Sequence, residues 1–475
     1  MRRVRCLNCL GVVLAVMAGG AAQAGPVTGN GVPIATEQPS LGLTYLIQTL
    51  ADNLDNVGQV VLFAGNYAPG GFNVANGQLV SIQANPILFS QLGTTYGGNG
   101  INSFALPNLS GRTVVGTGQG SGLTSRSLGS TAGATSQTLT ANELPPYGGA
   151  AGSNAGSQPV PTLQPSLALN EGVVLHGAFP SSAGQQATAP LIGQVLTYAG
   201  TLPSGVLAAN GTQLPISQQP PLYSVIGNTY GGDYPVTFAL PNLAGRVATE
   251  AGAAPGLTAQ ALGQTAGAEN TTLTVANLPP QPLTLANGRT AVVGGGMPFS
   301  LQQPSQALQY IIAVQGLFPS QTSDLTTGAP FLGEISLFAG SVAPAGWEFA
   351  DGQLLAIDSN EALFEVIGDT YGGNGINTFA LPDLEGRVAV GTGNGVTLGE
   401  MFGSDSETLD FAELPVGYPA VLPRTNKVPE PSSAAVLLVA LAGLAWARRR
   451  PRGSGFRRPE SPQSRPLREG LSSDF

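Results

Sequence analysis

Hydrophobic and polar residues follow the same order in three stretches of the chain, residues 58–112, 193–246 and 333–387. Each stretch opens with an apolar run, passes through a turn rich in glycine and proline, and closes on the segments TYGG, FALP and GR. The residues that begin the YGG and FALP segments recur at matching places: Tyr96, Tyr230 and Tyr371, and Phe104, Phe238 and Phe379. A repeat this long indicates small domains in tandem, because the units of a solenoid are shorter.

Short strands are predicted inside each stretch. In the first, residues 58–65 form an apolar strand. Residues 72–75 and 78–82 are expected to pair as a hairpin across Asn76-Gly77, because both turn residues tolerate a positive φ.

One short helix is predicted for each stretch. Residues 85–92 are helical in this interpretation, and the apolar residues of 359–367 fall at helical spacing. The glycine-rich residues 96–100 predict a loop.

A Gln-Pro-Ser motif introduces a further segment before each stretch, at residues 38–40, 164–166 and 303–305. The residues that follow it are rich in β-branched and aromatic side chains, which favours strands. The chain is therefore predicted to be mainly β, with three tandem small β domains that each carry one short helix.

These patterns divide the chain. The repeats span 58–145, 193–279 and 333–415, and the segments between them span 25–57, 146–192 and 280–332. Residues 147–158, rich in glycine, alanine and serine, are the most linker-like part of the interior.

The combined motifs FAG, AP-x-GW, DGQLL, TYGG, FALPDL and GR resemble the phage tail-collar family, including its bacterial members known as microcystin-dependent proteins. The resemblance covers most of residues 39–415. The third repeat is closest and carries Trp347, Asp351 and Asp383. The corresponding residues are Phe72, Asn76 and Asn108 in the first repeat, and Val206, Asn210 and Asn242 in the second.

The order of segments suggests a specific arrangement. In single-unit relatives the Gln-Pro-Ser segment follows the collar, whereas here residues 38–50 precede the first repeat and none follows the third. One hypothesis is that residues 38–50 complete the third repeat and close a pseudo-threefold ring, since phage collar relatives are homotrimers. The alternative is three separate beads, in a chain that is monomeric or homotrimeric.

The amino terminus resembles a secretory signal. Arg2, Arg3 and Arg5 precede the apolar run 10–18, and Ala22 and Ala24 predict cleavage after residue 24. The only cysteines, Cys6 and Cys9, would leave with residues 1–24, which excludes disulfides and thiolate chemistry in the remaining chain.

The carboxyl end resembles the PEP-CTERM sorting signal of Gram-negative exopolysaccharide producers. Its residues, spanning 428–450, are Val428, Pro429, Glu430 and Pro431, an apolar run from 434 to 447, and Arg448, Arg449 and Arg450. The family implies processing by an exosortase-type enzyme, with transient contact to the inner membrane. An ordinary carboxyl-terminal anchor is the alternative, and residues 451–475 are predicted to be a disordered tail.

Charge excludes one class of partner. Residues 25–427 carry seven basic and 23 acidic residues, a net charge of −16, and 14 of those acids lie between residues 331 and 415. Such a body is repelled by phosphate backbones, so nucleic acid is not expected as a partner.

The candidate chemistry is sparse, and no catalytic residue, metal site or cofactor is predicted. Glu348 with Asp351, or Asp383 with Glu385, supplies the two carboxylates that a glycosidase needs, but aspartates beside turns commonly cap backbone amides. His176 is the only histidine, and the histidine pair that binds metal in phage short tail fibres is absent.

Three other patterns are interpreted as structural. Asp405, Ser406 and Glu407 lack the ligand spacing of a calcium loop, and residues 391–395 resemble a phosphate cradle without its lysine. The recurring arginines are expected to pair with Asp or carbonyl groups inside their own repeats: Arg112, Arg246 and Arg387.

These observations favour a secreted, non-enzymatic protein of the Gram-negative cell surface, structural or adhesive, associated with exopolysaccharide or a surface glycan. The aromatic residues Tyr96, Tyr230 and Tyr371 either stack on sugars or pack in the core. The alternatives are a phage tail component that binds a host receptor and a polysaccharide hydrolase.

Overall fold

The structure is a computed structural model that describes residues 32, 34–50, 57–144, 160–183, 190–252, 254–279, 281–284, 290–293, 296–297, 299–321, 329–410 and 413–414. The predicted signal segment, the sorting segment, the 451–475 tail and most of the predicted linker lie outside these residues.

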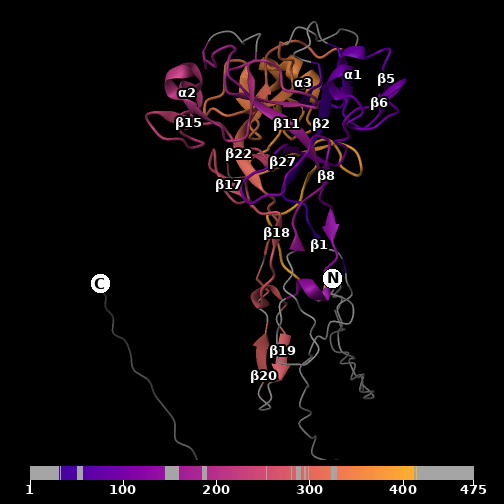
Figure 1. The fold of residues 1–475 in the computed structure, drawn as a ribbon, viewed down its shortest axis with the longest axis vertical. Helices are drawn as coiled ribbons and strands as arrows, with labels where there is room; N and C mark the ends of the chain where they lie inside the picture. Colours follow the sequence, from indigo (N-terminus) through magenta and orange to yellow (C-terminus); the bar gives the residue numbers. More distant parts are fainter. Residues whose placement is uncertain are drawn as a thin grey trace, which may run out of the picture. The chain divides into compact units, whose positions relative to one another are not determined.

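The three repeats have the same strands and one α-helix each in the same order, and Figure 1 labels the three helices α1, α2 and α3. The first consists of β1 (Ile34–Ala35), β2 (Ser40–Gln48), β3 (Gln59–Phe63), β4 (Phe72–Val74), β5 (Leu79–Ser81), α1 (Pro86–Leu92), β6 (Ser103–Ala105), β7 (Thr113–Gly116), β8 (Thr131–Ala132) and β9 (Ser136–Gln137). The second consists of β10 (Val160–Pro161), β11 (Ser166–Val174), β12 (Gln194–Tyr198), β13 (Val206–Ala208), β14 (Gln213–Pro215), α2 (Pro220–Ile226), β15 (Thr237–Ala239), β16 (Val247–Glu250), β17 (Thr265–Ala266) and β18 (Asn270–Thr271). A hairpin of β19 (Gln281–Thr284) and β20 (Thr290–Val293) follows.

The third repeat consists of β21 (Phe299–Ser300), β22 (Ser305–Ala313), β23 (Glu334–Phe338), β24 (Trp347–Phe349), β25 (Leu354–Ala356), α3 (Glu361–Ile367), β26 (Thr378–Ala380), β27 (Val388–Gly391), β28 (Met401–Phe402) and β29 (Ser406–Glu407). Short 3-10 helices span Ala141–Glu143, Ile216–Gln218, Val275–Asn277 and Ile357–Ser359. The mainly β prediction and the predicted helix in each repeat are confirmed.

Each long strand pairs with two repeats. The first half of β11 runs parallel to β7 of the first repeat, and its second half runs antiparallel to β12 and β13 of the second. The strand β22 joins the second repeat to the third in the same way, through β16, β23 and β24. The first long strand, β2, pairs with β3 and β4 of its own repeat, and its residues Ser40–Leu43 run parallel to Val388–Gly391 of the third.

The first strands of the three repeats also contact one another. β3 pairs with β12 and with β23, and β12 pairs with β23, each time antiparallel. These strands belong to one sheet of 15 strands, so the described parts of the repeats share hydrogen bonds instead of standing as independent folds.

The predicted hairpin across Asn76-Gly77 is wrong. Residues 72–74 (β4) pair with β2, whereas residues 79–81 (β5) pair with β6. The chain at Asn76-Gly77 crosses from one sheet to the other, and the N–H of Gly77 donates to the Pro107 carbonyl at 3.0 Å. Glycine is required there because its φ is +81° and a Cβ would crowd the Asn108 side chain. The turn residues indicated a change of direction but not the partner strand.

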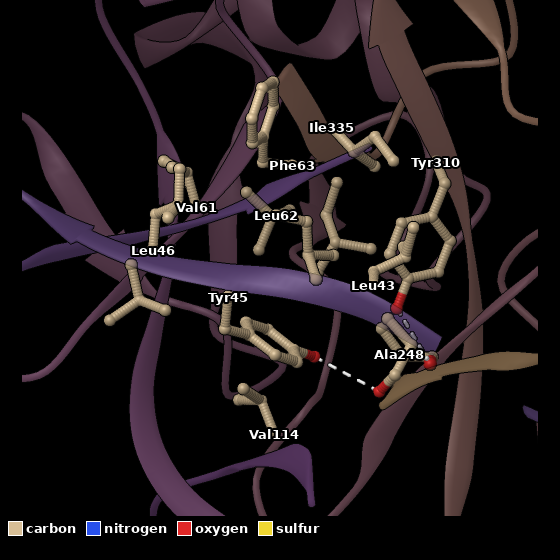
Figure 2. Packing of buried hydrophobic residues seen from close by; sticks show 14 of the residues in the cluster. Leu43, Tyr45, Leu46, Val61, Leu62, Phe63, Val114, Ala248, Tyr310 and Ile335 are labelled. Carbon is tan, nitrogen blue, oxygen red and sulfur yellow. Dashed lines mark hydrogen bonds between the residues drawn. The ribbon is translucent and has the colours of Figure 1, made fainter. Parts of the chain in front are cut away.

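The core lies where the repeats meet. Leu43, Leu46 and Phe63 are fully buried, and they share one apolar cluster with residues of all three repeats, including Val114, Tyr310 and Ile335 (Figure 2). A second cluster joins the segments before the long strands to the Leu-Pro segments, and includes Ile34, Val160, Phe299, Leu144, Leu278 and Leu414. Burial of apolar surface therefore stabilises the contacts between repeats as well as each repeat.

Candidate functional site: contacts between repeats and exposed loops

The recurring tyrosines lie at the junctions between repeats. The Tyr96 hydroxyl donates to the Ala199 carbonyl at 2.6 Å. The Tyr230 hydroxyl donates to Ala339 at 2.9 Å, and the Tyr371 hydroxyl donates to Ala64 at 2.7 Å. Each repeat thus contacts the next, and the third contacts the first. Burial raises the pKa of all three hydroxyls, and their partly buried rings pack against the core, which favours the packing interpretation over stacking on sugar.

Asp351 and Asp383 close a pair of turns in the third repeat. Asp351 Oδ1 accepts the Gln353 N–H at 3.2 Å, and Asp383 Oδ1 accepts the Glu385 N–H at 3.1 Å. The equivalent asparagines do the same in the other repeats: Asn76, Asn108, Asn210 and Asn242. Because the neutral amide serves as well as the carboxylate, these aspartates have a structural explanation.

The three recurring arginines lie beside the same turns. Arg387 Nη1 is 3.0 Å from a carboxylate oxygen of Asp383. Arg112 donates to the Asn108 carbonyl at 3.2 Å, and Arg246 donates to the Asn242 carbonyl at 3.5 Å. Each arginine therefore bonds a residue of its own repeat.

Trp347 begins β24 and is only 3% exposed. It packs in a small apolar cluster with Leu191, Ile311 and Phe338. The ring thus joins the third repeat to Leu191 of the second, and these contacts give it a packing role.

Three of the acidic candidates, Glu348, Asp351 and Asp383, each have a structural partner. Glu348 accepts a hydrogen bond from Gln353 Nε2 at 3.3 Å, and Asp351 and Asp383 are held in their turns. Within the described residues, no group of three His, Cys, Asp or Glu side chains has the arrangement of a metal site.

The remaining sequence candidates lie in turns. His176 is exposed and lies just after β11. In the segment 391–395, Asn394 adopts a φ of +52° and donates to the Ser110 carbonyl of the first repeat at 2.7 Å. Asp405 accepts hydrogen bonds from the Thr258 N–H of the second repeat and from Gln302, which lies just before β22. The contacts of Asn394 and Asp405 therefore join neighbouring parts of the fold and need no bound ligand to explain them.

Buried acids are the functional groups that the sequence analysis missed. Glu171 lies on β11, is 6% exposed, and aligns with Tyr45 and Tyr310 of the other long strands. Burial raises the pKa of Glu171 to about 8 and that of Glu334 to about 7. The pKa of Glu250 is also raised, by burial and by Asp351 and Glu385. The sequence does carry one sign of the buried Glu171, because it is the only charged residue in the predominantly apolar stretch 166–174.

A small cavity of about 30 Å³ lies where Glu171 replaces a third tyrosine. Its walls include Tyr45, Glu171, Tyr310 and the paired strands β3, β12 and β23. The Tyr45 hydroxyl donates to Ala389 and that of Tyr310 donates to Ala248, each at 3.2 Å, and Figure 2 shows both hydroxyls pointing toward the region of Ala248. Such a volume accommodates a water molecule.

The loops that follow the YGG turns are the most exposed apolar parts of the described chain. We call residues 99–103, 233–237 and 374–378 the loop tips. Ile101 is 85% exposed, Ile376 is 84% exposed and Tyr234 is 69% exposed. The tips are ordered: Asn99 Oδ1 accepts the N–H groups of Ile101, Asn102 and Ser103 at 3.0–3.1 Å, and Asn374 does the same in the third repeat. Exposed apolar surface can mark a binding site when it is contiguous, so the tips are the candidate contact points of the described chain.

No helix among the described residues is both long and apolar enough to cross a membrane. The predicted processing residues Ala22 and Ala24 and the whole of 428–450 lie outside the described residues.

Comparisons with known proteins agree with the repeat pattern. A family model described as Phage Tail Collar Domain matches residues 58–114, 193–248 and 333–389. A second, described as PEP-CTERM protein-sorting motif, matches residues 427–450. No curated protein and no solved structure matches the chain.

Proposed function

We propose, from three collar domains and a sorting motif in one chain, that this protein is a non-enzymatic structural or adhesive component of the Gram-negative cell surface. The sorting motif implies export to the surface or the extracellular space and processing by an exosortase. Collar domains are structural modules, which favours a binding or scaffolding role. The finer proposal is association with exopolysaccharide or another surface glycan, after transient anchoring in the inner membrane.

The architecture that we propose for this role is a closed pseudo-threefold ring made by a single chain. Three kinds of contact between repeats support it. The tyrosine hydrogen bonds go from the first repeat to the second, from the second to the third and from the third to the first. The strands β3, β12 and β23 pair with one another, and β2 pairs with β27. A homotrimer gains these contacts between subunits, whereas one chain with three repeats makes them internally.

The proposal of adhesion is based on the exposure of the loop tips. They present Ile101, Tyr234 and Ile376 on equivalent loops of three repeats, so a repetitive ligand would meet three attachment points. Three linked weak contacts gain avidity over one, provided that the ligand spans them.

Export is tested by the intact mass of the protein recovered from fractionated cells of its own host. We expect a species that begins at Gly25 and ends near Pro429, outside the outer membrane. A full-length chain in the cytoplasm or in virions would contradict export and favour a phage tail component.

Adhesion is tested by replacing Ile101, Tyr234 and Ile376 together with serine. We expect retention on the host's own exopolysaccharide to fall at least about tenfold, since the loss of roughly 1.4 kcal/mol of binding free energy has that effect. Unfolding should change little, because exposed substitutions usually alter stability by about 0.5 kcal/mol or less each.

Val342→Ser is the matched control, because Val342 is 60% exposed but lies outside the loop tips. Equal retention of all variants would contradict an adhesive role for the tips. Release of reducing sugar from the same polysaccharide, abolished by Glu348→Ala, Asp351→Ala or Asp383→Ala, would favour the hydrolase instead.

A further inference from the structure

The glutamines of the Gln-Pro-Ser motif have no part in the function proposed above, yet they are among the most buried polar residues. Gln38 is 3% exposed, Gln164 is 1% exposed and Gln303 is 2% exposed. Each lies just before a long strand, and the three come from segments more than a hundred residues apart. Polar side chains this deeply buried require hydrogen-bond partners.

The glutamines are linked to one another. The backbone N–H of Gln303 donates to Gln38 Oε1 at 3.1 Å, and the backbone N–H of Gln38 donates to Gln164 Oε1 at 3.2 Å. An N–H donor must face the carboxamide oxygen, so these two bonds fix which end of Gln38 and Gln164 carries nitrogen. The three segments therefore meet in one polar layer.

The carboxamide nitrogens of this layer lack acceptors. In the described part of the chain, Nε2 of Gln38, of Gln164 and of Gln303 is buried without a hydrogen-bond partner. Each nitrogen carries two N–H groups, so the layer has a surplus of donors. An unpaired buried donor costs folding free energy, and the equivalent glutamine of all three repeats has one.

Apolar side chains lie on both sides of the layer. The residues four positions earlier belong to one buried cluster, and those five positions later belong to another: Ile34, Val160 and Phe299, and Leu43, Leu169 and Leu308. Such side chains offer no acceptor, so the carboxamide nitrogens are open to a bound group.

We propose that Gln38, Gln164 and Gln303 together bind a small inorganic anion of halide size. An anion accepts several N–H bonds and donates none, which matches a layer with surplus donors. A water molecule accepts two bonds but adds two hydrogens that need acceptors of their own. Converging N–H groups form anion sites elsewhere in proteins, without a formal positive charge. The bound anion would fasten the three repeats at their common polar layer.

The direct test is anomalous diffraction from crystals of the purified protein grown in sodium bromide. We expect a bromide peak in hydrogen-bonding contact with the three Nε2 atoms. The solution test is thermal unfolding in sodium chloride or bromide against sodium gluconate at equal ionic strength. We expect a melting temperature higher by roughly 2–4 °C in the halide salts, the shift that a modest bound-ligand stabilisation produces.

Gln164→Met removes one carboxamide at nearly constant size, and the halide dependence of melting should disappear. The matched control is Gln306→Met: Gln306 is 4% exposed, and its carboxamide bonds Asn242 N–H and the Gly263 carbonyl. The control should lose stability but keep its response to halide. If Gln164→Met does not fold, the presence or absence of a bromide peak in crystals of the wild-type protein still tests the proposal. Water density or no bromide peak at the layer, with melting equal in all salts, would overturn the proposal.

Discussion

Deletion of residues 38–50 is expected to unfold the third repeat as well as the first. The segment contains β2, whose residues Leu43, Leu46 and Ile47 are completely buried. Losing one such side chain typically costs about 2–5 kcal/mol, and a whole domain is stable by only about 5–15 kcal/mol. The loss of β2 should therefore exceed the stability that both repeats possess.

Fluorescence can follow the third repeat alone. The chain has two tryptophans, and Trp347 is buried in that repeat. In a Trp446→Phe background, denaturant unfolding reports on Trp347 only. A midpoint that stays unchanged after the deletion would contradict the ring and favour three separate beads.

Gly42→Val provides a finer version of the same experiment. A Cβ on Gly42 would collide with the Thr397 carbonyl oxygen of the third repeat, while the antiparallel pairing of β2 with β3 begins only at Thr44. This variant should lower the Trp347 midpoint with less damage to the first repeat. The matched control is Tyr371→Phe, which removes one hydrogen bond from the third repeat to Ala64. Its cost should be smaller, on the order of 1–3 kcal/mol.

Glu171→Gln is expected to stabilise the protein at alkaline pH. Burial raises the pKa of Glu171 from 4.5 to about 8, so between these values the unfolded chain loses a proton that the folded chain keeps. The stability that this proton contributes is fully present below pH 4.5, falls as the pH rises, and is lost above about pH 8. The difference in unfolding free energy between wild type and variant should change by about 5 kcal/mol across this window.

The measurement is denaturant unfolding of both proteins from pH 4 to pH 9. Glu334→Gln is the matched control, because the pKa of Glu334 is raised only to about 7. The fall in unfolding free energy that Glu334 causes should therefore end near pH 7. Parallel pH profiles for wild type and Glu171→Gln would contradict the burial of an uncompensated acid in the central cavity.

Local signals account for what was predicted correctly. The helices α1 and α3 and the strands β2, β11 and β22 follow from residue spacing and β-branched content within short windows. The hairpin at Asn76-Gly77 failed because a turn signal is local, whereas β4 and β5 find their partners in strands distant in the sequence. The tyrosines of the YGG turns were correctly placed in loops, but their hydroxyl partners lie in another repeat.

Residue type and spacing are enough to identify three collar repeats, a mainly β fold and a sorting motif in this chain. The packing of the repeats against one another establishes which repeat each long strand joins, why the pKa of Glu171 is raised, and which side chains surround Gln38. Strand partners, desolvation and hydrogen-bond satisfaction depend on segments that lie far apart in the chain. No local pattern specifies them, because their free energy arises only when the repeats pack against one another.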